Sequence, residues 1–585
     1  MSPNGSFRSA RLAATEWTER FGSAKRTAAA CGFMAEAIRV FVDRFSARTG
    51  IPVTPSALPE GIAAARLDSR TAAVAETIGS EAAALDPISA GYWLSITYTA
   101  MLPQAMRGTL GIFYTPPALS DRLIQMATEA GVDWASCRVL DPACGGGAFL
   151  APTAQKMIEA LKGRSPAEVV ESISRRLRGF EIDPFAAWMS QVFLEVTMAE
   201  VCRAARRKLP RLVTVCDSLE QEPRDDAFDL VIGNPPYGRV TLNARLREHY
   251  RRSLYGHANL YGLFTDLALR WAAPGGVIAY VTPTSFLAGE YFKALRGLLA
   301  AEAPPIAVDF IATRKGVFEN VQQETMLATY RRGRQAATAT VHHLTVSTEG
   351  KASIEEAGAF AVPADPSGPW LIPRVPEHKP LIAGMARMKT RLVDWGYKIS
   401  TGPLVWNRHK EQLRSRPSQS TMPLIWSEAI AGPGQFLFRA EKKNHEPYFK
   451  LLPGDEWLTI DKPCVLLQRT TAKEQSRRLI AAALPEELIA ECGGVVVENH
   501  LNMVRPLNGR PGVTPAVVAA VLNSEIVDHA FRCISGSVAV SAFELEALPL
   551  PSVSEMSHLE ALVKRNAKPE TIERHLRALY LGEGA

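Results

Sequence analysis

The segment Asn234-Pro235-Pro236-Tyr237 carries the residue types with the clearest chemical use. It follows the apolar run 228–233, and a proline cannot donate to a sheet ladder, so a strand is expected to end here. The side-chain oxygen of Asn234 and the carbonyl oxygen of Pro235 are two acceptors on a corner that the prolines make rigid. When these two acceptors lie beside the hydrogens of a planar base amine, they favour a tetrahedral nitrogen. They also take up its developing positive charge, an effect of roughly 3–4 kcal/mol per group. Tyr237 offers an aromatic face for the base, worth about 1–3 kcal/mol. The segment therefore predicts an activated base amine, with no need for a metal or a covalent enzyme nucleophile.

A glycine-rich turn, Gly145–Gly147 in "DPACGGGAFL", is the candidate holder of the group that this amine attacks. Glycines let the backbone approach a ligand closely. The dinucleotide fingerprint GxGxxG is incomplete, because position 150 is leucine. Glu181 closes the next predicted strand, where a carboxylate accepts hydrogen bonds from a ribose diol. A ligand that carries adenosine without a pyrophosphate fits this pattern, and S-adenosylmethionine is such a ligand.

Upstream, "GIFYTPPALSDRLIQMA" (111–127) predicts a helix with Thr115 as its N-cap and Pro116 at its first position. Two interpretations stay open. Either Thr115 caps the helix and does nothing more, or Thr115 and nearby backbone groups bind the methionine end of the cofactor.

The pattern from 108 to 335 predicts the scaffold that gathers these residues. Strand patterns lie in 137–141, 177–184, 212–219, 228–237, 277–286, 305–318 and 324–333, and helical patterns lie in 148–161, 185–205 and 259–276, the last ending at Gly275–Gly276. Such alternation predicts an α/β fold with a doubly wound, mostly parallel, seven-stranded Rossmann-like sheet. Asp141, Glu181, Asp217 and Asn234 all fall at predicted strand ends. Ligands of such sheets bind at the carboxyl ends of the strands, so these four residues predict one site.

Three domains are expected. Residues 1–107 form a helical N-terminal extension, 108–345 form the sheet domain, and 346–585 form a mixed α+β domain. The polar segment 331–370, with its prolines and glycines, is expected to be a linker or the edge of the last domain. A chain of 585 residues with 47% hydrophobic and 22% charged residues is typical of a globular protein, not of a disordered or fibrous one.

The order of these motifs resembles the catalytic domain of gamma-class adenine-N6 DNA methyltransferases of restriction–modification systems. The matching segments are "GIFYTPP", "DPACGGGAFL", "GFEIDP", "CDSL", "NPPY", "NLYGLFTDLAL" and "KGVFENVQQET". The resemblance implies methyl transfer from S-adenosylmethionine to the N6 amine of an adenine that is flipped out of double-stranded DNA. It implies that Phe318 contacts the flipped base opposite Tyr237. It also implies a cofactor pocket built from Tyr114, Thr115, Asp141, Ala143, Cys144, Gly145, Gly147, Glu181, Ile182, Asp217, Ser218, Asn234 and Phe264. Ser218 departs from the family, which often has an aromatic or larger apolar residue there.

The C-terminal part resembles the target-recognition domain of the same family. Its recurring segments are similar to 399–410, 464–479, 495–506 and 534–551. Cationic side chains in these segments suit DNA phosphates, and the candidates are Arg408, Lys410, Arg469 and Lys473. Trp406 and Trp426 are expected to belong to the core rather than to contact DNA.

Two further patterns in this part resemble other chemistry. Pro463–Cys464 resembles the catalytic dipeptide of cytosine-C5 methyltransferases, but it lies outside the predicted sheet, so a buried structural cysteine is expected. Glu441 and Lys443 resemble the end of a nuclease motif, but no aspartate in a strand context precedes them, which disfavours a built-in endonuclease.

Alternative substrates remain open at this stage. N4-cytosine methylation needs similar chemistry, although such enzymes usually carry serine in place of Asn234. Glutamine amides and RNA amines also suit the motif, although glutamine methyltransferases are much shorter. A DNA-binding protein with an inactive pocket is disfavoured by the intact motifs.

Composition bears on partners and on location. The formal charge of +6 and the pI of about 8.8 permit a nucleic-acid partner. A homodimer and a restriction endonuclease are further candidate partners. Eight cysteines without a CxxC pattern are expected to be reduced thiols. The sequence has neither an apolar stretch of membrane-spanning length nor a secretory pattern, so a cytoplasmic location without a membrane partner is expected.

Overall fold

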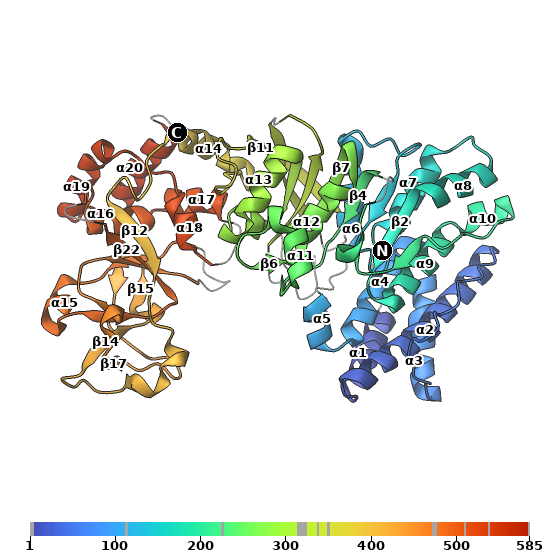
Figure 1. Ribbon diagram of the computed structural model, residues 1–585, viewed down its shortest axis with the longest axis horizontal. Helices are drawn as coiled ribbons and strands as arrows, with labels where there is room; N and C mark the ends of the chain where they lie inside the picture. The colour runs from blue at the N-terminus through green and yellow to red at the C-terminus, as the bar shows by residue number, and fades with distance from the viewer. Residues whose placement is uncertain are drawn as a thin grey trace. The chain divides into compact units, whose positions relative to one another are not determined.

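The computed structural model describes residues 5–110, 115–223, 227–312, 324–335, 338–347, 351–470, 477–507, 511–535 and 539–582, apart from the side chains of 108–110. The chain divides into two compact units. The first comprises Met1–Pro283 and Ala294–Glu356, and the second comprises Thr284–Lys293 and Ala357–Ala585. Figure 1 shows the helices and strands of both.

A nine-stranded sheet forms the centre of the first unit. Its spatial order is β11 (Ala352–Phe360), β10 (Ala339–Val346), β8 (Pro305–Ile311), β9 (Thr325–Arg331), β7 (Ala272–Pro283), β4 (Phe228–Gly233), β1 (Val139–Asp141), β2 (Leu177–Glu181) and β3 (Val213–Val215). Strand β9 runs antiparallel to β7 and β8. The pairs from β7 through β4, β1 and β2 to β3 are parallel, as is the pair β8–β10. The α/β class with a mostly parallel sheet is therefore confirmed.

Apolar side chains on both faces of the central strands explain this arrangement. One face packs Leu230, Ile232 and Val281 against helices on that side. Those helices are α6 (Pro117–Glu129), α7 (Leu150–Ala160) and α8 (Pro166–Arg176). On the other face, the ring of Trp271 packs against Phe180 at 5.5 Å between centroids. Strands buried on both faces favour parallel pairing, which brings their carboxyl ends together at one edge.

Further helices and a short hairpin of the first unit surround this sheet. They are α9 (Pro184–Thr197), α10 (Ala199–Ala205), α11 (Ala244–His249), α12 (Leu260–Trp271), α13 (Lys293–Glu302) and the short hairpin of β5 (Arg239–Val240) with β6 (Ala258–Asn259).

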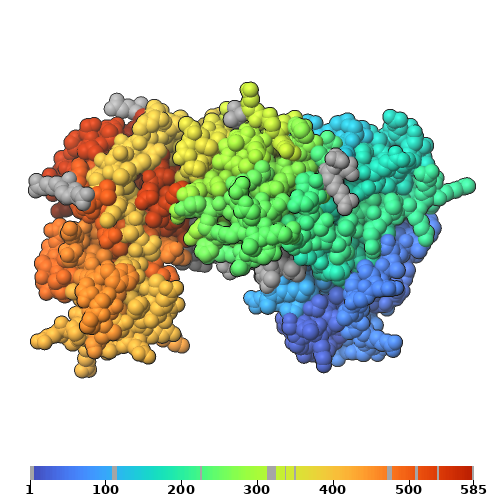
Figure 2. Space-filling view, viewed as in Figure 1, coloured from blue at the N-terminus to red at the C-terminus, as the bar shows by residue number. Residues whose placement is uncertain are grey.

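The N-terminal region is helical, as predicted. Its helices are α1 (Gly5–Glu19), α2 (Ser23–Thr49), α3 (Ser69–Ala83), α4 (Pro87–Met101) and α5 (Gln104–Leu110). They share a buried apolar cluster with α9, in which Phe41 of α2 meets Phe193. The hydroxyl of Tyr98 in α4 donates a 2.8 Å hydrogen bond to Asp183, just before α9. Figure 2 shows these helices in blue as one mass joined to the teal part of the first unit.

Two details of the predicted sheet domain are wrong. The helix expected in 259–276 ends at Trp271, and β7 already begins at Ala272. Pro274 explains the early end, because a proline disfavours helical backbone at the residue before it. The sheet has nine strands rather than seven, because it includes β10 and β11. Both lie in the segment 331–370, which was expected to be a linker or the edge of the last domain. In β10 the buried Ala339, Val341 and Leu344 are interspersed with polar residues that are exposed or half-buried, and these give the segment its polar composition.

The second unit combines small sheets with short helices. One sheet has the order β12 (Tyr397–Thr401), β22 (Leu501–Pro506), β19 (Val465–Gln468), β20 (Ala481–Ala483). A second has the order β13 (Leu413–Arg414), β17 (Tyr448–Lys450), β14 (Thr421–Ile425), β21 (Val495–Val497), β18 (Thr459–Ile460), and β15 (Ile430–Gly432) pairs with β16 (Gln435–Phe436). The helices are α14 (Lys379–Arg387), α15 (Glu486–Cys492), α16 (Pro515–Leu522), α17 (Glu525–Ile534), α18 (Ala542–Glu546), α19 (Met556–Lys564) and α20 (Pro569–Leu581).

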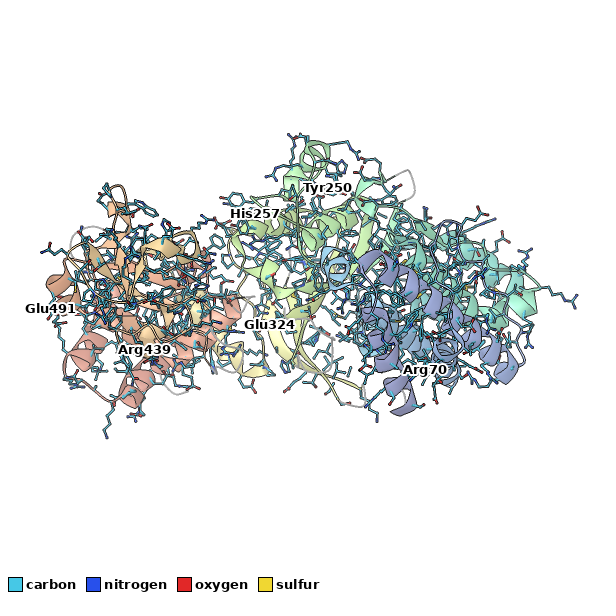
Figure 3. All side chains as sticks on the ribbon, turned by 90° about the horizontal axis from the view of Figure 1, so that it is seen from below. Arg70, Tyr250, His257, Glu324, Arg439 and Glu491 are labelled. Carbon is cyan, nitrogen blue, oxygen red and sulfur yellow. The ribbon has the colours of Figure 1, made fainter. Side chains whose placement is uncertain are left out.

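Three expectations about single residues of the second unit are met by its packing. Trp426 is buried, and Trp406 packs partly buried against the same apolar cluster. Cys464 is buried, and this burial raises the pKa of its thiol to about 12, so it is an inert core residue. Elsewhere in this unit, Arg439, labelled in Figure 3, donates from Nε to the carbonyl oxygen of Glu428 at 2.6 Å.

Within the described part of the chain, no helix is long and apolar enough to cross a bilayer.

Candidate active site

The glycine-rich turn joins β1 to α7 and is fixed by its own backbone. The amide of Cys144 donates to the carbonyl of Phe180 in β2 at 3.0 Å, and the amide of Gly147 donates back to the carbonyl of Cys144 at 2.8 Å. Gly145 and Gly147 have φ angles of 50° and 82°, which side chains rarely adopt. A Cβ atom on Gly147 would also lie 2.8 Å from Oγ of Ser190. Position 147 therefore requires glycine for both conformation and space.

Glu181 connects the end of β2 to this turn. Its Oε2 accepts from the amide of Gly145 at 2.8 Å, and its Oε1 accepts from the amide of Asp183 at 2.9 Å. Burial nevertheless raises the pKa of Glu181 to about 7. Each carboxylate oxygen has a second lone pair, so Glu181 can still accept hydrogen bonds from a ligand.

Asp141, at the end of β1, lies behind the turn. Its side chain is buried, Oδ1 accepts from the amide of Ala143 at 3.1 Å, and Oδ2 is a buried atom without a hydrogen-bond partner among the described residues. Burial raises the pKa of Asp141 to about 8.

Asp217 and Ser218 follow β3 on the other side of the turn. The carboxylate of Asp217 accepts from the amide of Leu219 at 3.0 Å and so starts a short 3-10 turn. Ser218 is buried and donates from Oγ to the carbonyl of Pro142 at 2.5 Å. The family's larger residue is thus replaced here by a serine that ties β3 to the glycine-rich turn.

Asn234 follows β4, and both ends of its carboxamide are engaged. Nδ2 donates to the hydroxyl of Thr115 at 3.1 Å, and Oδ1 accepts from the hydroxyl of Tyr237 at 2.7 Å. The ring of Tyr237 is only 6% exposed and meets Tyr261 edge to face, with centroids 6.1 Å apart. In this arrangement Tyr237 orients Asn234 and does not present an open aromatic face.

Thr115 is not the helix cap that the sequence predicts. Helix α6 begins at Pro117, its N-cap position is Pro116, and no side chain caps it. The second of the two prolines occupies the first helical turn, while the first holds Thr115 in extended backbone. The Thr115 hydroxyl is therefore available to accept from Asn234.

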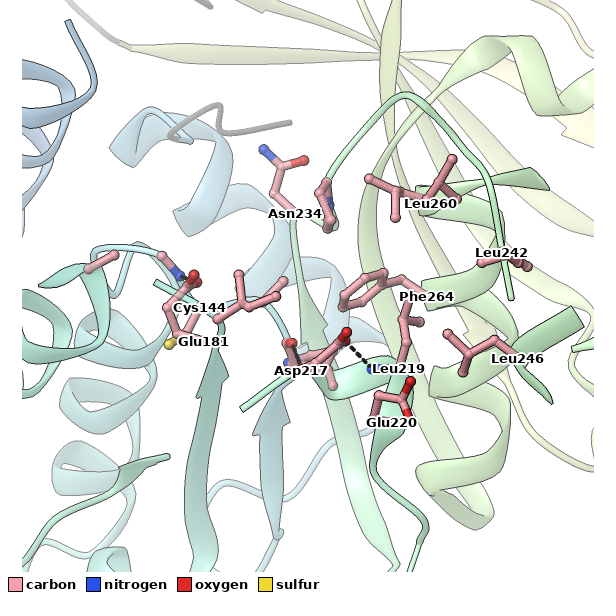
Figure 4. Close-up of a pocket in the computed structure, with 18 of the residues that line it drawn as sticks. Cys144, Glu181, Asp217, Leu219, Glu220, Asn234, Leu242, Leu246, Leu260 and Phe264 are labelled. Atoms are coloured by element: carbon pink, nitrogen blue, oxygen red, sulfur yellow. Dashed lines mark hydrogen bonds between the residues drawn. The ribbon is translucent and has the colours of Figure 1, made fainter. Parts of the chain in front are cut away.

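A cavity of about 490 Å³ opens between these strand ends. Figure 4 shows Cys144 and Glu181 on one side, Leu242, Leu246 and Leu260 on the other, and Asn234 at one end. The predicted residues that line it are Thr115, Ala143, Cys144, Gly145, Glu181, Ile182, Asp217, Ser218, Asn234, Pro236 and Phe264. Ile182 is 51% exposed, so its side chain is an apolar surface open to a ligand.

Several predicted residues do not line the cavity. Asp141, Gly147, Pro235 and Tyr237 lie next to the lining rather than in it. Tyr114 and Phe318 lie outside the described residues.

An apolar wall of the cavity was missed by the sequence analysis. It consists of Val240, Leu242, Leu246 and Leu260, together with the polar Thr241 and Asn243. Asn243 caps α11 by accepting from the amide of Leu246 at 2.8 Å. An asparagine followed by a short helical pattern is a helix-start signal that could have found α11.

The predicted DNA contacts in the second unit lie on its surface. Arg408, Lys410 and Arg469 are exposed, and the Nζ of Lys410 lies 5.8 Å from the ring centroid of Trp406. Lys473 lies outside the described residues. Within the described ranges, no group of three or more His, Cys, Asp or Glu side chains is placed to hold a metal ion.

The sheet order, the glycine-rich turn and the polar strand ends define a methyltransferase-type α/β domain. Residues 179–318 match the sequence profile of the Eco57I restriction-modification methylase family. The resemblance to restriction–modification methylases is thereby confirmed.

Relatives in sequence and in fold agree with this class. The chain is 24% identical to the Type II methyltransferase M.BsuBI of Bacillus subtilis, over 76% of this chain and 88% of that protein. It is 28% identical to the Type II methyltransferase M.PstI of Providencia stuartii, over 57% of this chain and 66% of that protein. The Type IIL restriction-modification enzyme MmeI, solved in complex with DNA, has a similar fold, with a TM-score of 0.61, 13% identity, and coverage of 100% of this chain and 97% of that one.

Proposed function

We propose that this protein transfers a methyl group from S-adenosylmethionine to the N6 amine of an adenine flipped out of double-stranded DNA. The observation that carries the proposal is the carboxamide of Asn234, which is fixed by Thr115 and Tyr237 at the end of a nucleoside-sized cavity. The same cavity has the carboxylates of Glu181 and Asp217 in its lining. The names of the Type II methyltransferase relatives support DNA as the substrate.

The residues present fit an adenosine-bearing cofactor. Glu181 retains lone pairs for ribose hydroxyls, while Ile182 and Phe264 offer apolar surface for an adenine ring. Asp217 can accept from the amine of that adenine through the oxygen that does not bond Leu219. When bound, the cofactor supplies an electrophilic methyl group on a sulfonium.

The residues at the end of β4 prepare the target amine. A base amine is a poor nucleophile because its lone pair is delocalised into the ring. The second lone pair of Asn234 Oδ1 and the carbonyl of Pro235 accept its two hydrogens, which localises the lone pair on nitrogen. The bonds to Thr115 and Tyr237 hold the carboxamide in place before the base arrives, so little reorganisation is needed during the reaction.

The stacking role of Tyr237 requires a movement. Because its ring is buried against Tyr261, it can meet a flipped base only by turning outward. The proposed chemistry requires that the hydroxyl of Tyr237 stays bonded to Asn234 during this turn.

The region from residue 346 onward, which includes most of the second unit, is proposed as the target-recognition domain. Its exposed Arg408, Lys410 and Arg469 suit phosphate contacts. Specificity would then come from base-edge contacts made by other side chains of this unit.

Nucleoside analysis tests the proposal. The protein is incubated with duplex DNA and S-adenosylmethionine labelled on the methyl group, and the DNA is digested to nucleosides. Label in N6-methyl-2′-deoxyadenosine supports it. Label in N4- or 5-methylcytosine, or transfer to RNA or protein in preference to DNA, would overturn it.

A further inference from the structure

A second cavity of about 490 Å³ lies in the first unit and shares no residue with the candidate active site. One wall is the extended segment 52–57. The opposite wall comes from the end of α9, from α10 and from the residues that follow α10. Nothing in the methyl-transfer chemistry uses this cavity.

The extended wall is fixed by a partly buried network. Glu195 of α9 accepts from the amide of Ser56 at 2.8 Å, from the hydroxyl of Ser56 at 2.5 Å, and from Nε2 of Gln191 at 3.1 Å. The indole of Trp188 donates to the carbonyl of Ser56 at 2.8 Å. The cavity is thus preformed. Glu195 is the one carboxylate in its lining, and hydrogen bonds from the protein already engage both oxygens of that group.

The opposite wall is strongly cationic. Arg203, Arg206, Arg207 and Lys208 all line the cavity, and each is exposed to solvent. Arg207 has an ion pair with Glu171 at 3.6 Å. The C-terminal dipole of α10 favours a cation in its last turn, which accounts for Arg203. It does not account for the cations beyond the helix end.

Arg206 has an unfavourable backbone conformation. It is the C-cap of α10 with φ 51° and ψ 38°, in the left-handed region. Glycine is the usual residue in this conformation, because a Cβ atom is disfavoured there. An arginine at this position suggests that its side chain is retained for a purpose other than stability.

We propose that this cavity binds the phosphate groups of a ligand, with Arg206 as the central contact. Guanidinium groups match phosphate oxygens in geometry and charge. The apolar part of the lining, from Pro52, Pro55, Ala57 and Leu209, suits the non-charged portion of a nucleotide. The phosphates come from a free nucleotide or from a nucleic-acid backbone, which share this chemistry.

The test measures binding of pyrophosphate to the full chain by calorimetry, with S-adenosylmethionine present to fill the other cavity. Arg206→Gly is expected to weaken pyrophosphate binding at least tenfold and to raise the melting temperature by about 2 °C, because it relieves the left-handed strain. Arg211→Ala is the matched control, since it removes an exposed cation next to the segment but outside the cavity lining. It should leave pyrophosphate binding unchanged.

Competition then identifies the source of the phosphates. Displacement of pyrophosphate by ATP alone assigns the site to a free nucleotide. Displacement by duplex DNA of unrelated sequence assigns it to a nucleic-acid backbone. The proposal is overturned if pyrophosphate does not bind, if Arg206→Gly binds it as wild type does, or if Arg211→Ala weakens binding equally. None of these readouts depends on methyl transfer, so failure of the proposed function leaves this test intact.

Discussion

The carboxamide of Asn234 is held at both ends by hydroxyl groups from different parts of the chain. Thr115 lies 119 residues before it and Tyr237 three residues after it. An amide fixed in this way keeps one orientation at the end of the cavity, which the proposed chemistry requires. The hydroxyl of Tyr237 and its ring therefore have separable tasks.

Tyr237→Phe separates these two tasks. It removes the hydroxyl bond to Asn234 and keeps the ring, so kcat is expected to fall about fivefold, as the loss of one hydrogen bond of about 1 kcal/mol predicts. Base capture, measured as the fluorescence rise of 2-aminopurine at the target position, should be retained. Tyr237→Ala is the matched comparison and should lose both. If Tyr237→Phe turns over like wild type, the hydroxyl does not orient Asn234.

The pKa of Glu181 predicts a pH dependence of cofactor binding. Burial raises the pKa of this carboxyl from 4.5 to about 7 in the free protein. Ribose hydroxyls and a cationic ligand favour the ionised form, so affinity for S-adenosylmethionine should rise as pH increases from 6 to 8 and then level off. Glu181→Gln should bind weakly and without this pH profile. A flat calorimetric profile for the wild type would remove Glu181 from this role.

The same shift has an effect of opposite sign on the unliganded fold. Between pH 4.5 and about 7 the folded protein holds a proton on Glu181 that the unfolded chain has lost. The stability that comes from this group is therefore full at low pH and is lost as the pH rises through 7.

At this scale the sequence identifies residue types but not partners. Asp141, Glu181, Asp217 and Asn234 could be predicted, because polar residues at the ends of apolar strands stand out. The bond between Thr115 and Asn234 could not, since it depends on where α6 and β4 meet. The buried orientation of Tyr237 also depends on tertiary packing, here against Tyr261 of α12.

Among the elements, α6 is tied to the outer strands by a buried ion pair. Nε of Arg122 in α6 lies 2.6 Å from Asp309 of β8, and both side chains are almost wholly buried. His342 of β10 contacts the other oxygen of Asp309 at 2.8 Å. Arg122 also reaches Glu129 at 3.0 Å. Because Thr115 precedes α6, this network helps to place the hydroxyl that holds Asn234.

Asp309→Ala is expected to destabilise the first unit by about 3–5 kcal/mol, since it leaves the buried Arg122 without its main counter-charge. The matched change Glu129→Ala removes a partner whose side chain is 48% exposed and should cost less than about 1 kcal/mol. Denaturant unfolding followed by tryptophan fluorescence measures both. Equal effects of the two changes would contradict the assigned importance of the Arg122–Asp309 pair.

The elements themselves were largely predictable between 137 and 333. Apolar strand patterns alternate there with amphipathic helices, and the glycine-rich turn marks the junction of β1 and α7. Strands β10 and β11 were missed because polar side chains are interspersed among their apolar residues, which resembles a linker in composition. The end of α12 was misplaced because Gly275–Gly276 was given more weight than Pro274.

At the scale of the whole molecule, the second unit carries the proposed DNA contacts. Its small sheets and short helices follow no simple sequence period, so its architecture could be predicted only as a mixed α+β domain. The function proposed for it rests on exposed cations rather than on its fold. Arg408 and Lys410 are the described candidates nearest in sequence to each other.

Arg408→Ala and Lys410→Ala are each expected to weaken DNA binding on cognate and unrelated duplexes alike. Each lost phosphate contact should make the negative slope of log affinity against log salt shallower by about 0.9. Fluorescence anisotropy across a salt series measures this slope. Lys564→Ala, an exposed cation on α19, is the matched control and should leave the slope unchanged. Unaltered slopes for the first two variants would show that these side chains do not meet phosphates.

Base-resolved sequencing of DNA from a host that expresses this chain tests the central claim most directly, because it reports the modified base, its position and its sequence context together. The wild-type protein should leave N6-methyladenine at one recurring sequence, and Asn234→Ala, which should still bind DNA, should leave none. Modified cytosine in place of adenine, or adenine methylation that persists in Asn234→Ala, would contradict the account.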